Sequence, residues 1–262
     1  MYLKFVNGLY LFIYTMIKRL IIFFYFLPCI LFSQIATSPL DQGQDLNVLY
    51  RNEACGSVFA HTRGWGIQYA RLKHVTGTRK RILEFSVANM KHPKEYKLKY
   101  EGISGNKSFY YGKLNSLIML RSGIGIQQIL YERSERKSLE VRMSTVLGCN
   151  LALVKPVYLY VFKDNLITPI IERYNPIEHN LSNIAGRAPM LFGFSNLTVR
   201  PGAYAKLGFS FEYGDYSNEV KAIETGVLVD VFPLPVATMA KIPQEQVFIT
   251  LYLSFVFGKK WF

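Results

Sequence analysis

The amino-acid sequence predicts an all-β protein, a small antiparallel transmembrane β-barrel of about eight strands with long extracellular loops. Three observations lead to this prediction. The N-terminus has the layout of a secretory signal peptide, apolar and polar residues alternate with a period of two along the rest of the chain, and the connections between the alternating segments are in turn short and long. The 19 Phe and 18 Tyr also favour strands, because aromatic side chains suit a pleated surface.

Residues 1–33 are predicted to be a cleaved signal peptide. A short basic start precedes an apolar run over 20–32, and the small or polar Ser33 and Gln34 follow it. An N-terminal membrane anchor is the alternative, but the run is shorter than the ~20 residues that a spanning helix needs. We expect a periplasmic segment over 34–53 and the barrel over 54–262.

The clearest alternation covers residues 139–153. Its odd positions are mostly large and apolar, whereas its even positions include Glu140, Arg142 and Asn150 among small residues. A soluble sandwich also alternates, but so long a stretch with so polar a second face favours a strand that faces lipid on one side. The other segments predicted as strands are 54–61, 65–73, 83–88, 118–127, 202–212, 222–231 and 249–258.

The connections test this assignment independently. If the N-terminus is periplasmic, the turns after the second, fourth and sixth strands are periplasmic, and the outer loops follow the third and fifth strands. The predicted turns, at 74–79, 133–137 and 214–217, are short and polar. The predicted outer loops at 92–112 and about 163–200 are the longest, that at 233–245 is intermediate, and the one at 62–64 is short. An even strand count brings the last strand back beside the first, so that the sheet has no edges.

The inward-facing rows carry many charges for so small a barrel. Eight strands enclose just enough room for side chains, so we expect a charge-paired, plugged interior that rigidifies the barrel. A narrow gated pore or a small-ligand pocket is the alternative. The predicted interior network consists of Glu84, Arg121, Glu140, Arg142, Lys206, Glu212, Glu224 and Asp230.

The sequence gives little support to an enzyme. The four histidines lack metal-ligand spacing, and the motifs of serine hydrolases, zinc proteases and phosphate-binding loops do not occur. We therefore expect no enzymatic activity, no cofactor and no metal. The weak catalytic candidates are His61, near the outer rim of the first strand, and Ser57 on its face, as in a lipid-modifying barrel enzyme. Both residue types are also common at a rim.

Two further groups of residues suggest contacts with the surroundings. Tyr and Trp near strand ends predict aromatic girdles at the membrane interfaces. The girdle residues are Trp65, Tyr69, Tyr252 and Trp261. The loop at 163–200 is too apolar to be merely solvated, so we expect it to cover the barrel mouth or to dock on another protein. Its predicted docking residues are Ile170, Ile171, Met190, Phe192 and Phe194.

The net charge of +13 bears on the partners. An exported basic chain meets anionic headgroups and lipopolysaccharide phosphates before it meets nucleic acid, so we expect outer-membrane lipids as partners and no nucleic acid. The loop at 92–112, with Lys91 beside it, carries five lysines that either bind lipopolysaccharide or are solvated. Cys55 and Cys149 fall on different predicted strands, and a disulfide is not indicated.

Five stretches of the chain resemble a known group of proteins. They are HTRGWGI (61–67), MKHPKE (90–95), YGKLNSL (111–117), AKLGFSFEYG (205–214) and LYLSFVFGK (251–259). Together with the signal ending in FSQ, they resemble an uncharacterised family of outer-membrane β-barrel proteins of Bacteroidota. The resemblance implies the bacterial cell outer membrane and the barrel fold, and it implies hardly anything about activity.

The C-terminus departs from the usual terminal signal of such barrels. The outward row of the last strand is odd and continues to Trp261, whereas Phe262 is even. Either Gly258 allows a bulge, or Trp261 is the anchor that the barrel-assembly machinery meets. Our leading hypothesis is a monomeric plugged barrel that is a structural or accessory subunit of an outer-membrane complex. The alternative is a small-ligand transporter or a lipid-modifying barrel enzyme.

Overall fold

The computed structural model describes residues 52–99, 108–132, 139–163, 168–213 and 218–261, and the account below concerns these residues. The predicted signal peptide (1–33), the segment 34–51, the turns at 133–137 and 214–217 and Phe262 lie outside them. In the part of the chain that the structure describes, no helix is long and apolar enough to cross a bilayer.

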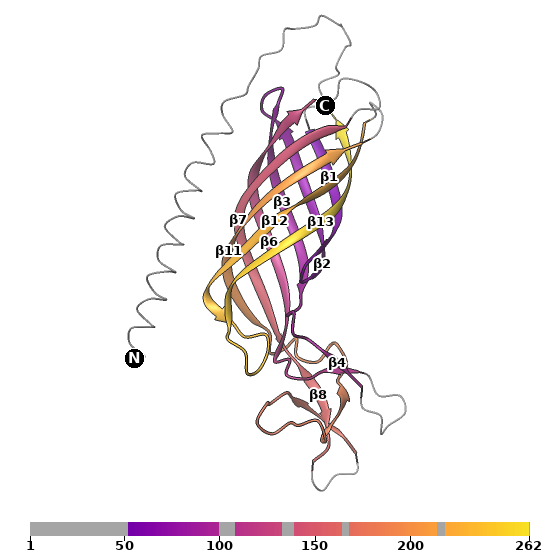
Figure 1. Ribbon diagram of the computed structural model, residues 1–262, viewed down its shortest axis with the longest axis vertical. Coiled ribbons are helices and arrows are strands. Elements are labelled where there is room, and N and C mark those ends of the chain that lie inside the picture. The colour runs from indigo at the N-terminus through magenta and orange to yellow at the C-terminus, as the bar shows by residue number, and fades with distance from the viewer. Residues whose placement is uncertain (1–51, 100–107, 133–138, 164–167, 214–217, 262) are drawn as a thin grey trace, which may run out of the picture. The chain divides into compact units, whose positions relative to one another are not determined.

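Eight long strands form a closed antiparallel barrel, shown in Figure 1, so the predicted fold class is confirmed. Their order around the barrel is β1-β13-β12-β11-β7-β6-β3-β2. Seven of the eight predicted strands lie within one of them, and the strand predicted over 139–153 begins one residue before the observed one. Their bounds are β1 (Asn52–His61), β2 (Gly64–His74), β3 (Arg79–Met90), β6 (Asn115–Tyr131), β7 (Glu140–Pro156), β11 (Thr198–Glu212), β12 (Glu219–Val236) and β13 (Glu245–Trp261).

The two faces of the barrel wall follow the period of two in the sequence. In β13, Leu251 and Phe255 face outward and are about half exposed, whereas Thr250 and Ser254 are buried inside. The same holds around the barrel, because successive side chains of a strand point to opposite faces. Exposed outward residues of the other seven strands include Val58, Ile67, Phe85, Ile124, Leu147, Leu207 and Val231.

The two ends of the barrel differ in their connections. At one end, which we call the turn end, β2 and β3 are joined by a tight turn in which the Val75 amide donates to the Arg79 carbonyl (2.9 Å). The opposite end, which we call the loop end, carries the long connections β3–β6 and β7–β11. The tight hairpin between β1 and β2 is also there, and it requires Gly64, since a side chain at this position would collide with the Asn89 carbonyl.

The barrel closes between β1 and β13 with an uninterrupted register. The pairs run from Asn52 opposite Trp261 to His61 opposite Tyr252, and Gly258 lies opposite Cys55 without a bulge. The predicted alternative of a bulge at Gly258 is therefore wrong, and Trp261 ends the outward row. The barrel also begins at Asn52, two residues before the predicted boundary.

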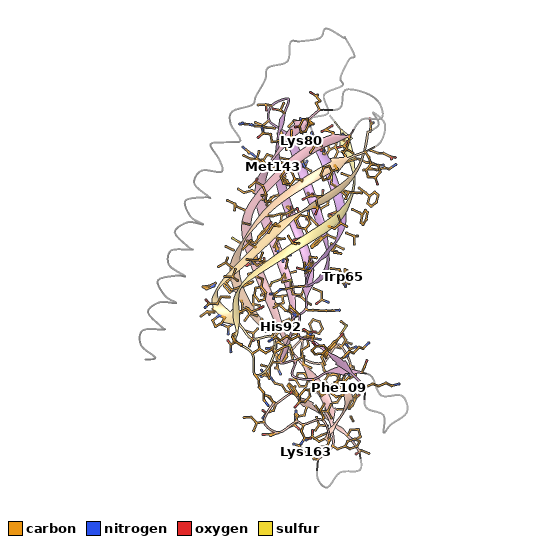
Figure 2. The ribbon with its side chains drawn as sticks, in the orientation of Figure 1. Trp65, Lys80, His92, Phe109, Met143 and Lys163 are labelled. Carbon is orange, nitrogen blue, oxygen red and sulfur yellow. The ribbon has the colours of Figure 1, made fainter. Side chains whose placement is uncertain are left out.

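Beyond the loop end the long connections form a second, smaller structure with its own core. Its strands are β4 (Lys97–Leu98), β5 (Phe109–Tyr110), β8 (Tyr158–Val161), β9 (Ile170–Arg173) and β10 (Ile184–Arg187), in a sheet β10-β8-β9 and a pair β4-β5. We call residues 91–99, 108–114, 157–163 and 168–197 the loop module. Its core consists of Phe109, Leu159, Val161, Tyr174 and Ile184, and Figure 2 shows Phe109 there.

Backbone hydrogen bonds tie the loop module to the barrel. The Val157 amide, just after β7, donates to the Leu114 carbonyl, and the Leu114 amide donates to the Thr238 carbonyl, each at 3.0 Å. The Ala240 amide donates to the Gly112 carbonyl at 2.8 Å. Three connections that are far apart in the sequence therefore meet at the loop end and hold the module against it.

Candidate functional site

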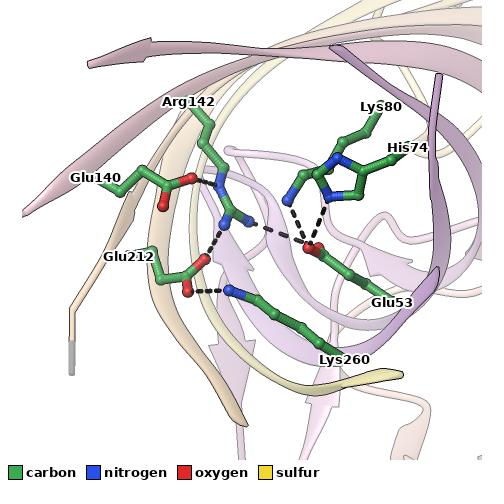
Figure 3. A network of polar contacts seen from close by, with 7 residues as sticks. All are labelled: Glu53, His74, Lys80, Glu140, Arg142, Glu212 and Lys260. Carbon is green, nitrogen blue, oxygen red and sulfur yellow. Dashed lines mark hydrogen bonds and ion pairs between the residues drawn. The ribbon is translucent and has the colours of Figure 1, made fainter. Parts of the chain in front are cut away.

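The barrel lumen is crossed by charged side chains at several levels, of which the first lies nearest the turn end. Arg142 of β7 is its hub, as Figure 3 shows. Its guanidinium pairs with Glu140 (Nε to Oε1, 2.5 Å), with Glu212 of β11 and with Glu53 of β1 (Nη1 to Oε2, 3.7 Å). Three strands are thus joined through one side chain, which is only 4% exposed.

Three further residues complete this first level. Lys80 lies 2.5 Å from Glu53, and His74 lies 3.5 Å from the same carboxylate. Lys260 lies 2.6 Å from Glu212. These three residues and Glu53 are absent from the predicted interior network, because the predicted barrel begins at 54 and His74 falls in a predicted turn. Lys80 and Lys260 fall outside the predicted strands 83–88 and 249–258. The alternation continued through these positions and was the signal that could have found them.

The second level surrounds Lys206 of β11. Its ammonium nitrogen lies 2.7 Å from Glu84 of β3 and 3.1 Å from Glu224 of β12, and it donates to the Gln68 amide oxygen (3.0 Å). The Tyr252 hydroxyl donates to Glu224 at 2.6 Å. One cation therefore meets two carboxylates, and a phenol completes the hydrogen bonding of one of them.

The third level lies nearer the loop end. Arg121 of β6 makes a bidentate contact with Asp230 of β12, with Nε–Oδ1 and Nη2–Oδ2 both at 2.8 Å. The Asn150 amide donates to Asp230 Oδ1 at 2.7 Å. Parallel hydrogen bonds of this kind are the strongest geometry available to a guanidinium and a carboxylate.

The space left between these levels is small. A cavity of about 30 Å³ lies between the first and second levels, and its lining includes Glu53, Ser57, Glu84 and Arg142. That is room for one or two water molecules, since a water needs on the order of 10–15 Å³ by the same measure. A hydrated ion or an organic ligand does not fit there.

The structure places all eight residues of the predicted interior network on the inward face. Seven are buried, and Glu140 is half-buried beside the turn end. Each has an opposite charge within ion-pair distance. The pairing arises because inward positions of neighbouring and facing strands fall at matching heights along the barrel.

The two catalytic candidates are not brought together. Ser57 and His61 both point inward from β1, but four residues of strand separate their Cα atoms by roughly 13 Å. His61 Nδ1 instead accepts the Arg63 amide (3.2 Å), and its ring packs 5.9 Å from Phe59. A serine and a histidine must touch to act as nucleophile and base, so this geometry does not form a dyad.

Glu172, Glu178 and His179 gather in the loop module with ligand atoms within 4.8 Å of one another, a grouping that the sequence analysis did not single out. His179 Nδ1 accepts the Asn175 amide at 3.0 Å, which leaves the ring proton on Nε2, 3.8 Å from Glu172. A protonated nitrogen cannot ligate a metal. Lys163 already lies 3.2 Å from Glu172, so ion pairing accounts for the cluster without a metal.

Of the predicted girdle residues, Tyr252 is misplaced. It is buried inside the barrel against Glu224, so its assignment to the membrane interface is wrong. Its even position already indicated the inward face. Trp65 and Trp261 are exposed on outward rows near strand ends, at the loop end and the turn end respectively. Tyr69 is also outward and exposed, but it lies in the middle of β2 rather than at its end.

The predicted docking residues divide into two groups. Ile170 and Ile171 are half-buried in β9, where they contribute to the small sheet. Met190, Phe192 and Phe194 are 74%, 46% and 50% exposed in a turn after β10. The same module contains one buried phenol, that of Tyr174, whose pKa is raised by burial and by the neighbouring Tyr111.

We compared the chain with protein families, curated proteins and solved structures. No family model matches the sequence, and no curated protein matches it. Among solved structures, Ail, the attachment invasion locus protein of Yersinia pestis, solved in complex with the heparin analogue sucrose octasulfate, is similar over 81% of this chain and 100% of its own, with 8% identity and a TM-score of 0.40. Neisserial surface protein A covers 81% of this chain and 97% of its own, with 9% identity and a TM-score of 0.39. Likeness at this level adds nothing to the closed barrel described above.

Proposed function

We propose that this chain is an integral protein of the bacterial outer membrane whose plugged barrel conducts nothing and anchors the loop module as a docking surface. One observation carries the proposal, namely that the barrel's outward rows form a continuous exposed apolar belt. In a soluble protein, exposed apolar patches larger than a few hundred Å² mark binding surfaces or membrane contact. A belt of apolar side chains to which all eight strands contribute is the surface that a barrel in contact with lipid presents.

The height of the belt fits a bilayer. On β13 the outward residues from 247 to 257 are all apolar and 46% to 62% exposed, namely Val247, Ile249, Leu251, Leu253, Phe255 and Phe257. Ten steps of strand cover roughly 33 Å. At a strand tilt of about 40° this spans roughly 25 Å, which is the height of the apolar band of outer-membrane barrels.

The interior supports a barrel that is closed rather than conducting. The three levels of paired charges cross the lumen, and the cavity of about 30 Å³ has no room for a hydrated ion. Because each buried charge has an opposite partner, opening the lumen would leave several charges uncompensated. We therefore propose a structural or accessory role rather than a pore or a small-ligand transporter.

The loop module supplies the proposed docking surface for another outer-membrane protein. The turn after β10 presents Met190, Leu191 and Phe192 outward, with 74%, 81% and 46% exposure. Lys155 fixes this turn, because its ammonium donates to the Met190 carbonyl (2.5 Å) and lies 4.6 Å over the Phe194 ring. An apolar tip held in a defined shape suits a protein partner, since little conformational entropy is lost on binding.

Further parts of the proposal concern export and the outer leaflet. We infer that residues 1–33 are a cleaved signal and that the barrel-assembly machinery inserts the chain. Its resemblance to uncharacterised outer-membrane barrels of Bacteroidota supports the same location. The exposed lysines at the start of the β3–β6 connection, including Lys91, Lys94 and Lys97, suit lipopolysaccharide phosphates. We infer no enzymatic activity, since Ser57 and His61 do not meet.

Three experiments test these statements. Outer-membrane fractionation with heat-modifiable gel mobility tests insertion, and an even distribution between soluble and membrane fractions would contradict it. Purified protein in planar bilayers is expected to give no single-channel steps, and stable steps would overturn the plugged interior. A phospholipid or lipid A change that disappears with His61→Ala would favour the enzyme.

The docking surface has its own test. Cross-linking in intact outer membranes is expected to join the wild-type chain to one membrane protein in stoichiometric yield, and the variant Met190→Ser/Phe192→Ser is expected to lose that product. The matched control Tyr96→Ser/Leu98→Ser alters two exposed apolar residues elsewhere in the loop module and is expected to keep it. Equal yields from both variants would contradict the assignment.

A further inference from the structure

We propose that the outer surface of β12, β13 and β1 at the turn end binds an anionic glycerophospholipid. The inference rests on the proposed membrane insertion and adds a specific lipid class and a site. Three observations support it. They are a groove on that surface, the lysines at the rim of the groove, and the position of the groove at the turn-end edge of the apolar belt.

The groove has a volume of about 620 Å³, within the range of ligand sites. Its outward-facing lining comprises Ala54 of β1, Glu219 and Lys221 of β12, and Phe257, Lys259 and Trp261 of β13. Val220 and Gly258 complete it. The register explains how these residues meet, since Lys259 lies between Ala54 and Glu219, and Phe257 lies between Gly56 and Lys221.

Small residues keep the β1 side of the groove low. The β1 residues opposite Lys259 and Phe257 are Ala54 and Gly56, and a Cβ atom at Gly56 would meet nothing within 4 Å. Phe257, which is 55% exposed, and Trp261, which is 38% exposed, stand above this floor on β13. A shallow apolar trough bounded by aromatic rings suits an acyl chain.

The charge at the groove is complementary to a phosphate. Lys221 and Lys259 both face outward and are exposed, and the only acidic side chain lining the described groove is Glu219, which lies 2.8 Å from Lys221. The basic surface continues around the barrel over β2 and β3. Its further members, all exposed on outward rows, are Arg71, Lys73, Arg79 and Arg81.

The position of the groove favours a lipid over a protein. Phe257 is the last apolar residue of the β13 outward row before Lys259. The trough therefore continues from Phe257 into the apolar belt, and the cations lie between the belt and the turn end. A lipid whose chain lies along Phe257 and Ala54 brings its phosphate to Lys221 and Lys259. Trp261 then lies at the headgroup level, where indole rings are favoured. If the N-terminus is periplasmic, this is the phospholipid leaflet.

The test uses the full mature chain in nanodiscs that contain equal amounts of phosphatidylglycerol and phosphatidylcholine. Lipids that stay bound after mild detergent release are counted by native mass spectrometry. We expect wild type to retain phosphatidylglycerol preferentially. Each basic residue near an anionic surface adds roughly fivefold to such a preference. Lys221→Gln/Lys259→Gln is therefore expected to reduce the ratio of retained phosphatidylglycerol to phosphatidylcholine by more than tenfold.

Two variants separate the groove from general charge. Arg173→Gln/Arg187→Gln removes the same charge from two exposed positions of the loop module and is expected to leave the ratio unchanged. Ala54→Leu keeps every charge but fills the trough, and it is expected to reduce retention of both lipids. An unchanged ratio in Lys221→Gln/Lys259→Gln would overturn the proposal. A preference for lipid A over phosphatidylglycerol that this same variant abolishes would overturn it as well.

The same samples distinguish failure of this inference from failure of the proposed function. Heat-modifiable mobility and protease protection report whether the barrel has inserted. A chain that does not insert contradicts the proposed membrane barrel. A chain that inserts normally but retains both lipids equally contradicts the phospholipid site and leaves the membrane barrel in place.

Discussion

Arg121 and Asp230 join opposite parts of the barrel wall through two hydrogen bonds of 2.8 Å, although β6 and β12 are separated by two other strands on their shorter side. The side chains are 1% and 0% exposed. A pair so fully buried stabilises the barrel only as a pair, since either charge alone would be buried without an opposite charge.

The first prediction therefore concerns this pair. Arg121→Leu and Asp230→Leu are each expected to lower the free energy of unfolding by about 3–5 kcal/mol, because each leaves one buried charge behind. The double variant is expected to recover most of that loss. Urea unfolding in lipid vesicles, followed by heat-modifiable mobility, measures the three values. Additive losses in the double variant would show that the two residues are not coupled.

The second prediction concerns the hub of the first level. Arg142→Met leaves Glu53, Glu140 and Glu212 close together with less positive charge among them, and we expect a loss of about 3–5 kcal/mol. Lys163→Met breaks the exposed pair with Glu172 and is expected to change stability by less than about 1 kcal/mol. The same unfolding assay compares them, and similar losses would contradict the hub.

The third prediction concerns two glycines in the wall. A Cβ atom at Gly148 would collide with the Ser122 carbonyl oxygen and lie 2.7 Å from the Tyr204 ring, whereas one at Gly56 would meet nothing. We expect Gly148→Ala to destabilise the barrel by about 1–3 kcal/mol and Gly56→Ala to be nearly neutral. Refolding yield in detergent and the unfolding midpoint check this. A tolerant Gly148 would mean that β6 and β7 can move apart.

The fourth prediction concerns two tyrosines that face opposite sides of the wall. Tyr252→Phe removes the hydrogen bond to Glu224 and is expected to cost about 1.5–3 kcal/mol, the range for bonds to charged groups. Tyr69→Phe alters an exposed outward ring and is expected to be nearly neutral. If the two variants unfold at the same urea concentration, Tyr252 does not support the second level.

The fifth prediction concerns Trp65 and Trp261, the two tryptophans of the sequence. Both lie on outward rows near strand ends, so we expect lipids brominated near the headgroup to quench their fluorescence more than lipids brominated deep in the chain. Trp65→Phe and Trp261→Phe separate the two signals. Stronger quenching by the deeper label would place that residue inside the belt rather than at an interface.

The strands and their facing were predictable because a period of two admits only two phases, and the wrong phase would expose charges to lipid. Glu84 and Lys206 could thus be placed inside from alternation alone. Their pairing with each other could not be predicted, since β3 and β11 are not neighbouring strands. The order of the strands around the barrel determines which inward side chains come into contact.

A prediction from residue type is wrong where it disagrees with the alternation of inward and outward positions along a strand. Tyr252 was assigned to a girdle because tyrosines favour interfaces, although its even position indicated the lumen, and the phase prevailed. Lys80 and Lys260 lie just outside the predicted strands 83–88 and 249–258, so those bounds did not include them in the inward rows. The loop module was not predictable as a sheet, since β8 and β9 are four residues each and too short to show alternation.

The pairing of Asn52 with Trp261, which begins an uninterrupted register between β1 and β13, leads to an expectation about the order of folding events. Seven of the eight seams of the barrel join strands that follow one another along the chain, and the seam between β1 and β13 alone joins its two ends. Contacts of such sequence separation form slowly, because the loop-closure entropy is lost before any hydrogen bond compensates for it. Those seven seams can form while the last remains open. We therefore expect the closing of this one seam to be the slow phase of refolding, and a nascent chain that lacks β13 to be an open sheet.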